Sequence, residues 1–258
     1  MRVLNQAYDH PMELEQRAAD PLAGGLMRGY QCGQVWGAAL AAGAQAYQIF
    51  GKGPQAEAAA MIASQQIVES FRTQNKSIDC RAITGIDLSA PKPWIIIRFL
   101  LKSGPTGSCF GMAARCAKVA FDELNSALSE EYIEAPSTPV SCSAILAQKM
   151  GASDLQTVMA AGLAGGIGLS GGACGALGTA IWIVRMNEAR EQVGNAGYTD
   201  PNISDVIDRF VESTDGEFEC SKIVGRKFES INDHAGYLHA GGCSKIIEVL
   251  AAQGRMLK

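Results

Sequence analysis

A short pattern of glycine and cysteine occurs twice in this 258-residue chain, and it constrains the fold more than any other feature. In the second half, Leu163-Ala164-Gly165-Gly166 is followed eight residues after its last glycine by Cys174-Gly175, where an apolar run to Trp182 begins. In the first half, Leu22-Ala23-Gly24-Gly25 is followed after seven residues by Cys32-Gly33. Two copies of one pattern predict an internal repeat.

Two further cysteine motifs occur in the same order in both halves. Cys80-Arg81-Ala82-Ile83-Thr84-Gly85 matches Cys220-Ser221-Lys222-Ile223-Val224-Gly225, and Cys116-Ala117-Lys118-Val119 matches Cys243-Ser244-Lys245-Ile246. Three matches in one order predict two homologous units in tandem.

The unit boundaries follow from these matches. We predict a first unit over residues 1–130 and a second over 137–258, joined by a stretch of acidic, small and proline residues at 129–139. The first unit carries an insertion at about 86–111, which contains Cys109 and the apolar run from Trp94 to Leu101. That run is compatible with either a strand or a helix.

The apolar residues favour helices throughout. The clearest stripe, at i, i+3, i+4, i+7 and i+8, belongs to a helix that follows residue 200 and consists of Ile203, Val206, Ile207, Phe210 and Val211. Helices are also predicted at 11–27, 32–50, 54–72, 108–128, 141–150 and 154–163. We expect an all-α protein whose two units pack around a shared core with a pseudo-twofold relation.

The uncharged stretch from 160 to 184 is long enough to span a bilayer. Its many glycines interrupt a helix, so we expect buried helices with a glycine break and no membrane span. The net charge of -4 gives no reason to expect nucleic acid as a partner. The N-terminal residues lack the apolar core of a signal peptide, so we expect a cytoplasmic protein.

Cysteine use is the strongest compositional signal. Eight cysteines in a chain without an export signal favour metal binding or redox chemistry over structural disulfides. Each unit offers four, and they are Cys32, Cys80, Cys109 and Cys116 in the first and Cys142, Cys174, Cys220 and Cys243 in the second. The first unit lacks a counterpart of Cys142, and Cys109 is the spare thiol that would substitute for it.

Most of these thiols lie near predicted helix starts, where the helix dipole is expected to lower a thiol pKa. Four thiolates suit an iron-sulfur cluster or zinc, but zinc sites usually contain close Cys-x-x-Cys pairs, which are absent here. Widely spaced cysteines favour a cluster or a redox dithiol. Glycines near them, especially Gly33, Gly172 and Gly175, are expected to let backbone N–H groups approach the sulfur centre.

Two histidines precede Cys243 and are weaker candidates. His239 lies four residues before it and His234 five residues earlier, and such a histidine can share a metal with cysteine. We expect both to be solvated or to cap helices instead.

The order Cys142, then Cys174-Gly175-Ala176, then Cys220 and Cys243 resembles the C-GCAxxG-C-C family of redox proteins, which is related to the non-haem domain of split-Soret cytochromes. The likeness covers nearly the whole chain as two units. It implies a helical fold with cysteine-ligated iron or a redox dithiol, at these four residues and at their first-unit matches Cys32, Cys80 and Cys116. Neither unit keeps the central motif intact, and no Cys-x-x-Cys-His site for covalent haem exists.

Three functions remain open from the sequence. The first is electron transfer through one or two cysteine-ligated iron-sulfur clusters, with a redox partner protein and a homodimer as further expectations. The second is a metal-free thiol/disulfide oxidoreductase. The third is a non-enzymatic interaction subunit in which the cysteines fill the core as small hydrophobic residues.

Overall fold

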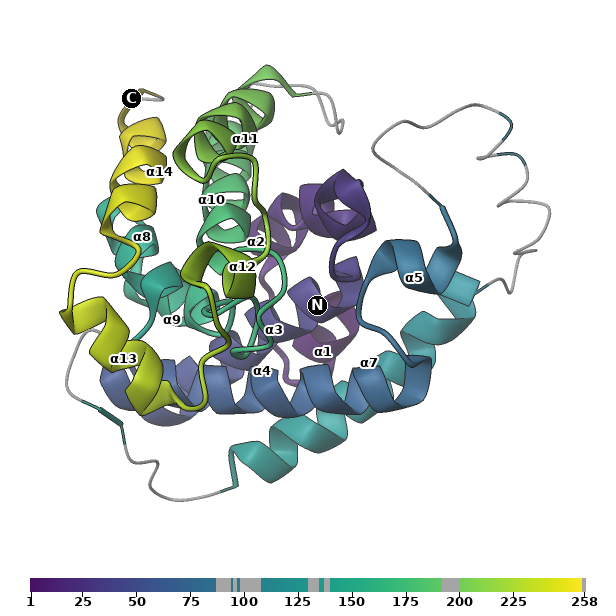
Figure 1. Cartoon of the computed structure of the whole chain (residues 1–258). Coiled ribbons are helices and arrows are strands. Elements are labelled where there is room, and N and C mark those ends of the chain that lie inside the picture. Colours follow the sequence, from purple (N-terminus) through teal and green to yellow (C-terminus); the bar gives the residue numbers. More distant parts are fainter. Residues whose placement is uncertain are drawn as a thin grey trace.

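The computed structural model describes residues 1–86, 94, 97, 108–129, 135–136, 140–191 and 200–256. Within these ranges the protein is all-α, as predicted, and its only extended pairings are two isolated bridges. Figure 1 shows the first half of the chain, in purple and blue, beside the second, in green and yellow.

The helices of the first unit are α1 (Arg2–Ala7), α2 (Glu13–Ala18), α3 (Gly33–Phe50), α4 (Pro54–Asn75), α5 (Cys80–Thr84) and α7 (Ser108–Ala127). Those of the second are α8 (Cys142–Lys149), α9 (Asp154–Ala161), α10 (Gly175–Glu191), α11 (Pro201–Ser213), α12 (Cys220–Val224), α13 (Ile231–His239) and α14 (Ser244–Met256). By order and motif, α3, α4 and α5 correspond to α10, α11 and α12. The helices predicted at 32–50, 54–72, 108–128, 141–150 and 154–163 are confirmed within a few residues.

The predicted helix at 11–27 is wrong. α2 ends at Ala18, a 3-10 turn follows over Asp20–Leu22, and the chain then enters a left-handed turn over Gly25–Gly29. Pro21 supplies no N–H to continue α2, and the glycines after it favour positive φ angles. The segment predicted as one helix therefore contains three short elements.

The left-handed turn is repeated in the second unit. The φ angles are 59° at Leu26 and 54° at Met27, and they are 66° at Ile167 and 59° at Leu169. Each such residue costs roughly 1–2 kcal/mol because its Cβ approaches the backbone carbonyl. A strained turn present at the same place in both units indicates that its shape is needed there.

Both units contribute to one continuous hydrophobic core. α3 packs against α4 of its own unit and against α9 of the second, while α10 packs against α2, α8, α11 and α14. Glycines permit the close approach between units. A Cβ at Gly178 on α10 would collide with the ring of Trp36, and one at Gly43 on α3 would collide with the backbone of Met159.

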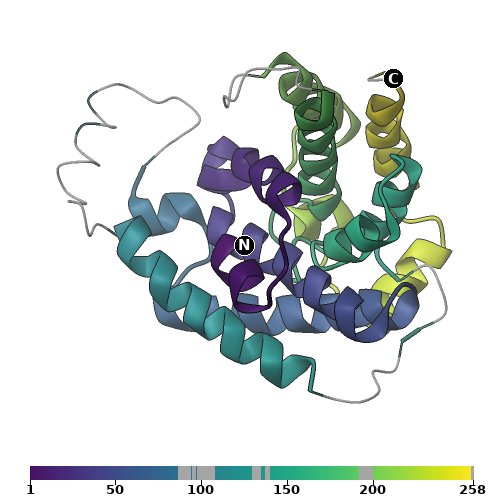
Figure 2. The same cartoon turned by 180° about the vertical axis from the view of Figure 1, so that it is seen from behind.

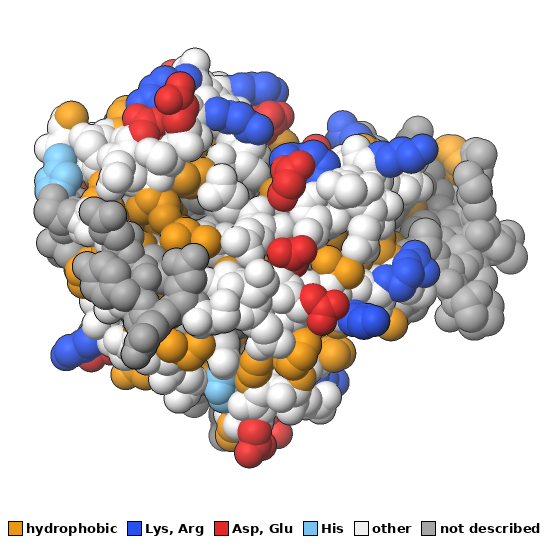
Figure 3. Space-filling model, turned by 90° about the horizontal axis from the view of Figure 1, so that it is seen from below, with side chains coloured by type: hydrophobic (Ala, Val, Ile, Leu, Met, Phe, Trp, Pro, Cys, Tyr) orange, Lys and Arg blue, Asp and Glu red, His pale blue; other side chains and the backbone are white. Residues whose placement is uncertain are grey.

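In both views of the ribbon, α4 and α7 lie side by side along one edge of the molecule (Figures 1 and 2). On the face drawn in Figure 3, acidic and basic side chains lie interspersed with hydrophobic ones. No helix within the described residues is both long and apolar enough to cross a membrane.

Two predictions concern residues that lie largely outside the described ranges. They are the insertion at about 86–111, with its apolar run, and the linker at 129–139. The boundaries 1–130 and 137–258 therefore stay predictions.

Candidate functional site

In the first unit, a pair of backbone hydrogen bonds holds two cysteines side by side. Gln31 and Asp79 form an isolated antiparallel bridge. The N–H of Cys32 donates to Ile78 O at 2.7 Å, and the N–H of Cys80 donates to Tyr30 O at 2.7 Å. Cys32 caps the start of α3 and Cys80 is the first residue of α5, so the bridge brings two helix starts together.

The second unit repeats this arrangement. Ala173 and Glu219 form the corresponding bridge. The N–H of Cys174 donates to Phe218 O at 2.8 Å, and the N–H of Cys220 donates to Gly172 O at 2.7 Å. The repeat inferred from sequence is thus also a repeat of local hydrogen bonding, centred on the matched cysteines.

The remaining cysteines of the first unit come from α7. Cys116 is buried and Cys109 is half-buried, and both are close enough to Cys32 that a negative charge on either would raise its pKa. Cys109 acts in the same way on Cys80. Asn75 donates its side-chain amide to the Cys116 sulfur at 3.9 Å. The spare thiol Cys109 therefore lies with the three matched cysteines.

The second unit gathers its four cysteines in the same way. Negative charge on Cys174, Cys142 or Cys243 would raise the pKa of Cys220, and Cys142 and Cys174 both act on Cys243. Cys142, Cys174 and Cys220 are buried, whereas Cys243 is half-buried. Each unit thus combines three buried thiols with one that lies nearer the surface.

Burial, not the helix dipole, controls most of these thiols. Burial raises the pKa of Cys32 and of Cys174 to about 12, although backbone N–H groups in the first turns of α3 and α10 act to lower it. Burial likewise raises the pKa of Cys80, Cys116 and Cys220. The expectation of lowered thiol pKa values at helix starts is wrong for these residues, because a thiolate loses more hydration energy than the helix N–H groups return.

Cys142 is the exception. Burial would raise its pKa, but the positive charge of His234, a hydrogen bond from Gly165 N–H and one from Ser143 together lower it. Burial would lower the pKa of His234, yet Cys142 and the hydrogen bond to Val140 O raise it. Each residue of the pair therefore favours the charged form of the other.

The His234 ring is fully buried. Its Nδ1 lies 2.9 Å from Val140 O, while Nε2 makes no conventional hydrogen bond. The expectation of a solvated or capping His234 is wrong. Its position between two cysteine motifs was the one sequence signal for a role at the site. The sequence could not show which cysteine it faces, because Cys142 lies far away along the chain.

Gln31 connects the two units and was not singled out from the sequence. Its buried side chain donates from Nε2 to Gly166 O at 3.0 Å and accepts at Oε1 from Ala173 N–H at 2.8 Å. The first-unit bridge residue thereby ties down both the second unit's glycine turn and the residue before Cys174. In the sequence, only its position directly before Cys32 indicated that Gln31 lies at the site.

The three glycines predicted to adjoin a cofactor lie in tightly packed backbone beside the cysteines. A Cβ at Gly33 would lie 2.8 Å from Ala23 Cα, one at Gly175 would collide with Leu163 O, and one at Gly172 would collide with the Gln31 side chain. Packing explains why these residues have no side chain: Gly33 and Gly175 lie where a helix start packs on the preceding turn, and Gly172 lies against Gln31 of the first unit. A contact with a cofactor stays a prediction.

All eight cysteines are free thiols. Within the described residues, no three histidine, cysteine or acidic side chains converge closely enough to hold a metal ion. The cysteines of each set nevertheless lie close enough to influence one another's pKa.

Two segments, residues 1–132 and 137–254, each match the family described as "Putative redox-active protein (C_GCAxxG_C_C)". The chain belongs to this family. Both the resemblance drawn from the cysteine order and the tandem arrangement of this C-GCAxxG-C-C protein are confirmed. No curated protein and no solved structure gives a significant match.

Proposed function

We propose that this C-GCAxxG-C-C protein transfers electrons through iron-sulfur clusters held by cysteine, one in each unit. The observation that carries the proposal is the gathering of four free, mostly buried thiols around each backbone bridge. The ligands would be Cys32, Cys80, Cys109 and Cys116 in the first unit and Cys142, Cys174, Cys220 and Cys243 in the second.

The chemistry of the donor set suits a cluster, because four cysteine thiolates are the usual ligands of an iron-sulfur cluster. Four thiolates around one zinc ion each lie about 2.3 Å from it, so their sulfurs nearly touch. Among the residues that the structure describes, no three such side chains form a group that could hold a single metal ion. A cluster has a width of its own, and ligands around it are correspondingly farther apart.

A bound cluster would supply one-electron redox chemistry, and the protein would set its environment. Burial of three thiols per unit excludes water from the site. The N–H groups at the starts of α3 and α10 point at the sulfurs of Cys32 and Cys174 and would stabilise their negative charge. Because Cys109 and Cys243 are half-buried, each proposed site would lie near the surface, where a redox partner protein would reach it.

Anaerobic purification followed by iron and sulfide analysis tests the proposal. We expect both elements, with visible absorption bands from thiolate-to-iron charge transfer. Cys174→Ser and Cys32→Ser should each remove about half of the iron, because each disrupts one of two equivalent sites. Each variant is the control for the other unit. A colourless protein free of iron under these conditions would overturn the proposal.

The Cys142–His234 pair favours a second candidate, a metal-free thiol/disulfide oxidoreductase. The Cys142 thiolate would attack a substrate disulfide and expel one thiolate, and a second cysteine of the unit would then displace the other. The substrate gains two electrons and two thiols of the protein become a disulfide. Thiol counting after mild oxidation separates the candidates, since this mechanism requires rapid loss of thiols in pairs.

A further inference from the structure

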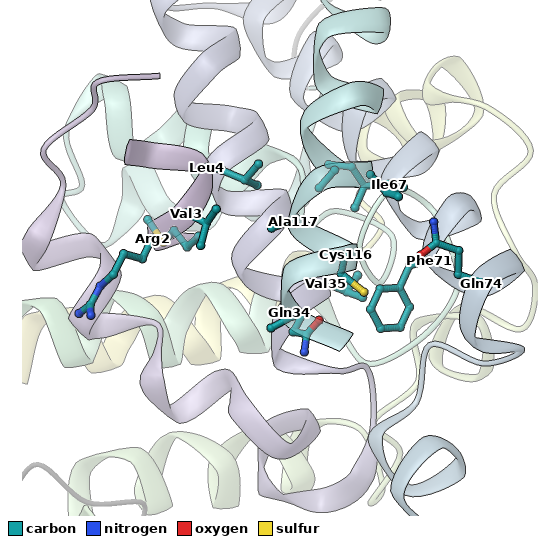
Figure 4. Close-up of a pocket in the computed structure, with 15 residues that line it drawn as sticks. Arg2, Val3, Leu4, Gln34, Val35, Ile67, Phe71, Gln74, Cys116 and Ala117 are labelled. Carbon is teal, nitrogen blue, oxygen red and sulfur yellow. The ribbon is translucent and has the colours of Figure 1, made fainter. Parts of the chain in front are cut away.

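A cavity of about 240 Å³ lies within the first unit, between α1, α3, α4 and α7. Figure 4 shows its lining, in which Cys116 and Phe71 lie near each other at one end and Val3 and Leu4 at the other. Most of the lining is apolar, and among the described residues that form it Arg2 has the one charged side chain. The interior therefore favours a ligand that is mainly apolar and uncharged.

Gln34 provides a polar group in this apolar wall. Its Nε2 donates to Cys109 O at 2.9 Å, which fixes the orientation of the amide. Its Oε1 is buried without a hydrogen-bond partner. An unpaired buried acceptor is unfavourable, so the position is suited to a ligand that brings one donor.

The size and shape of the cavity limit the ligand further. A cavity of about 150 Å³ lined by apolar side chains is enough to hold benzene. The present cavity is larger and has the ring of Phe71 on one side, next to Ile67. It has room for one substituted ring or two fused rings.

We propose that this cavity binds a small neutral aromatic molecule with one hydroxyl or N–H donor, such as a phenol or an indole. The donor would bond to Gln34 Oε1, and the ring would pack against Phe71 and Ile67. The bound molecule would lie against Cys116, beside the first thiol cluster.

Calorimetric titration of the full-length protein with phenol, indole and toluene tests the site. We expect saturable binding of phenol and indole. Gln34→Met removes the acceptor and should weaken phenol binding about five- to tenfold, the effect of one hydrogen bond, with toluene binding changed less than about twofold. Gln148→Met, the same change on the exposed face of α8, is the control and should alter neither.

Ala120→Leu supplies a second arm, because Ala120 is buried in the cavity wall and a larger side chain there fills the space. This variant should lose binding of all three probes while keeping its helical circular dichroism. Failure of the wild-type protein to bind phenol and indole saturably overturns the proposal, as does equal phenol binding by Gln34→Met and Gln148→Met. Titrating protein with and without iron keeps this result separate from the cluster proposal.

Discussion

The two units hold their matched cysteines in the same way and complete their thiol sets differently. In both, an isolated bridge joins the starts of two helices and buries a pair of thiols. The fourth thiol comes from α7 in the first unit, as Cys109, and from the start of α8 in the second, as Cys142. Only Cys142 is paired with a histidine among the residues that the structure describes.

This difference shows which part of a duplicated site is constrained. The bridge depends on backbone geometry, so both copies keep it and the turn beneath it. The fourth thiol needs only to reach the same place, so different helices can supply it. If both sites carry clusters, a positive charge on His234 would stabilise the reduced form in the second unit, which would then be the more easily reduced.

The largest expected effect tests the shared part of the two units. Gly175→Ala places a Cβ against Leu163 O, and we expect it to lower the free energy of unfolding by about 4 kcal/mol, at the upper end for overpacking. Gly33→Ala meets Ala23 less closely and should cost about 1–2 kcal/mol. Urea denaturation of the metal-free protein measures both.

Gly236→Ala on α13 is the control for these variants. A Cβ there meets nothing within 4 Å, so the change should be neutral or stabilising by up to about 1 kcal/mol through helix propensity. Equal losses at Gly175 and Gly236 would contradict the packing explanation.

The second prediction concerns a buried acidic residue in α4 that has no counterpart in α11. Burial raises the pKa of Glu57 to about 7 from an ordinary 4.5, whereas the matching position three residues after the first proline of α11 is Ser204. A raised folded-state pKa means that stability is full below pH 4.5 and is lost as pH rises through 7. Glu57→Gln should therefore stabilise the protein by roughly 3 kcal/mol at pH 8 and hardly at pH 4.

Thermal and urea unfolding between these pH values measure the Glu57 effect. Ser204→Ala should leave the pH dependence unchanged, because it removes no titrating group. A Glu57→Gln protein whose stability falls with pH as steeply as that of the wild type would show that another group is responsible.

The third prediction concerns the pair found in the second unit alone. His234→Phe should raise the pKa of Cys142 and remove its thiolate absorbance at neutral pH. The loss of stability should be about 2 kcal/mol, limited because Cys142 can take up a proton once its partner is gone. Cys109→Ser in the first unit should keep the thiolate signal.

The pH dependence of this third effect has a definite sign. The lowered pKa of Cys142 stabilises the fold at higher pH, and this contribution is lost as the pH falls through the folded-state pKa of Cys142. The raised pKa of His234 stabilises the fold at lower pH, and that contribution is lost as the pH rises through the folded-state pKa of His234. The difference between wild type and His234→Phe should thus peak between the two values. A difference that does not vary with pH would argue against the ion pair.

The smallest expected effect lies between the units. Lys52, after α3, pairs with Asp154 at the start of α9 at 3.2 Å, and both side chains are largely exposed. Such pairs contribute little, so Lys52→Ala should change the free energy of unfolding by less than about 0.5 kcal/mol. A double-mutant cycle with Asp154→Ala measures the coupling. A coupling above about 1 kcal/mol would mean that this surface pair adds measurably to the contact between the units.

Much of the fold could be predicted because its signals are local. Pro54 and Gly51 mark the boundary between α3 and α4, and the apolar stripe beginning at Ile203 marks α11. The left-handed turn after Leu22 was missed because Leu26 and Met27 have no preference for positive φ. Packing against the rest of the unit holds them there, and no local pattern reveals it.

The sequence by itself determined the helical class, the duplication and the identity of the eight cysteines, because periodicity, repeat order and residue chemistry are properties of short segments. The tertiary structure alone decided that the buried His234 lowers the pKa of Cys142 and that Gln31 links the units. It also decided that burial outweighs the helix dipole at most thiols. These outcomes depend on desolvation and on contacts between residues far apart in the chain, which only the packed core brings about.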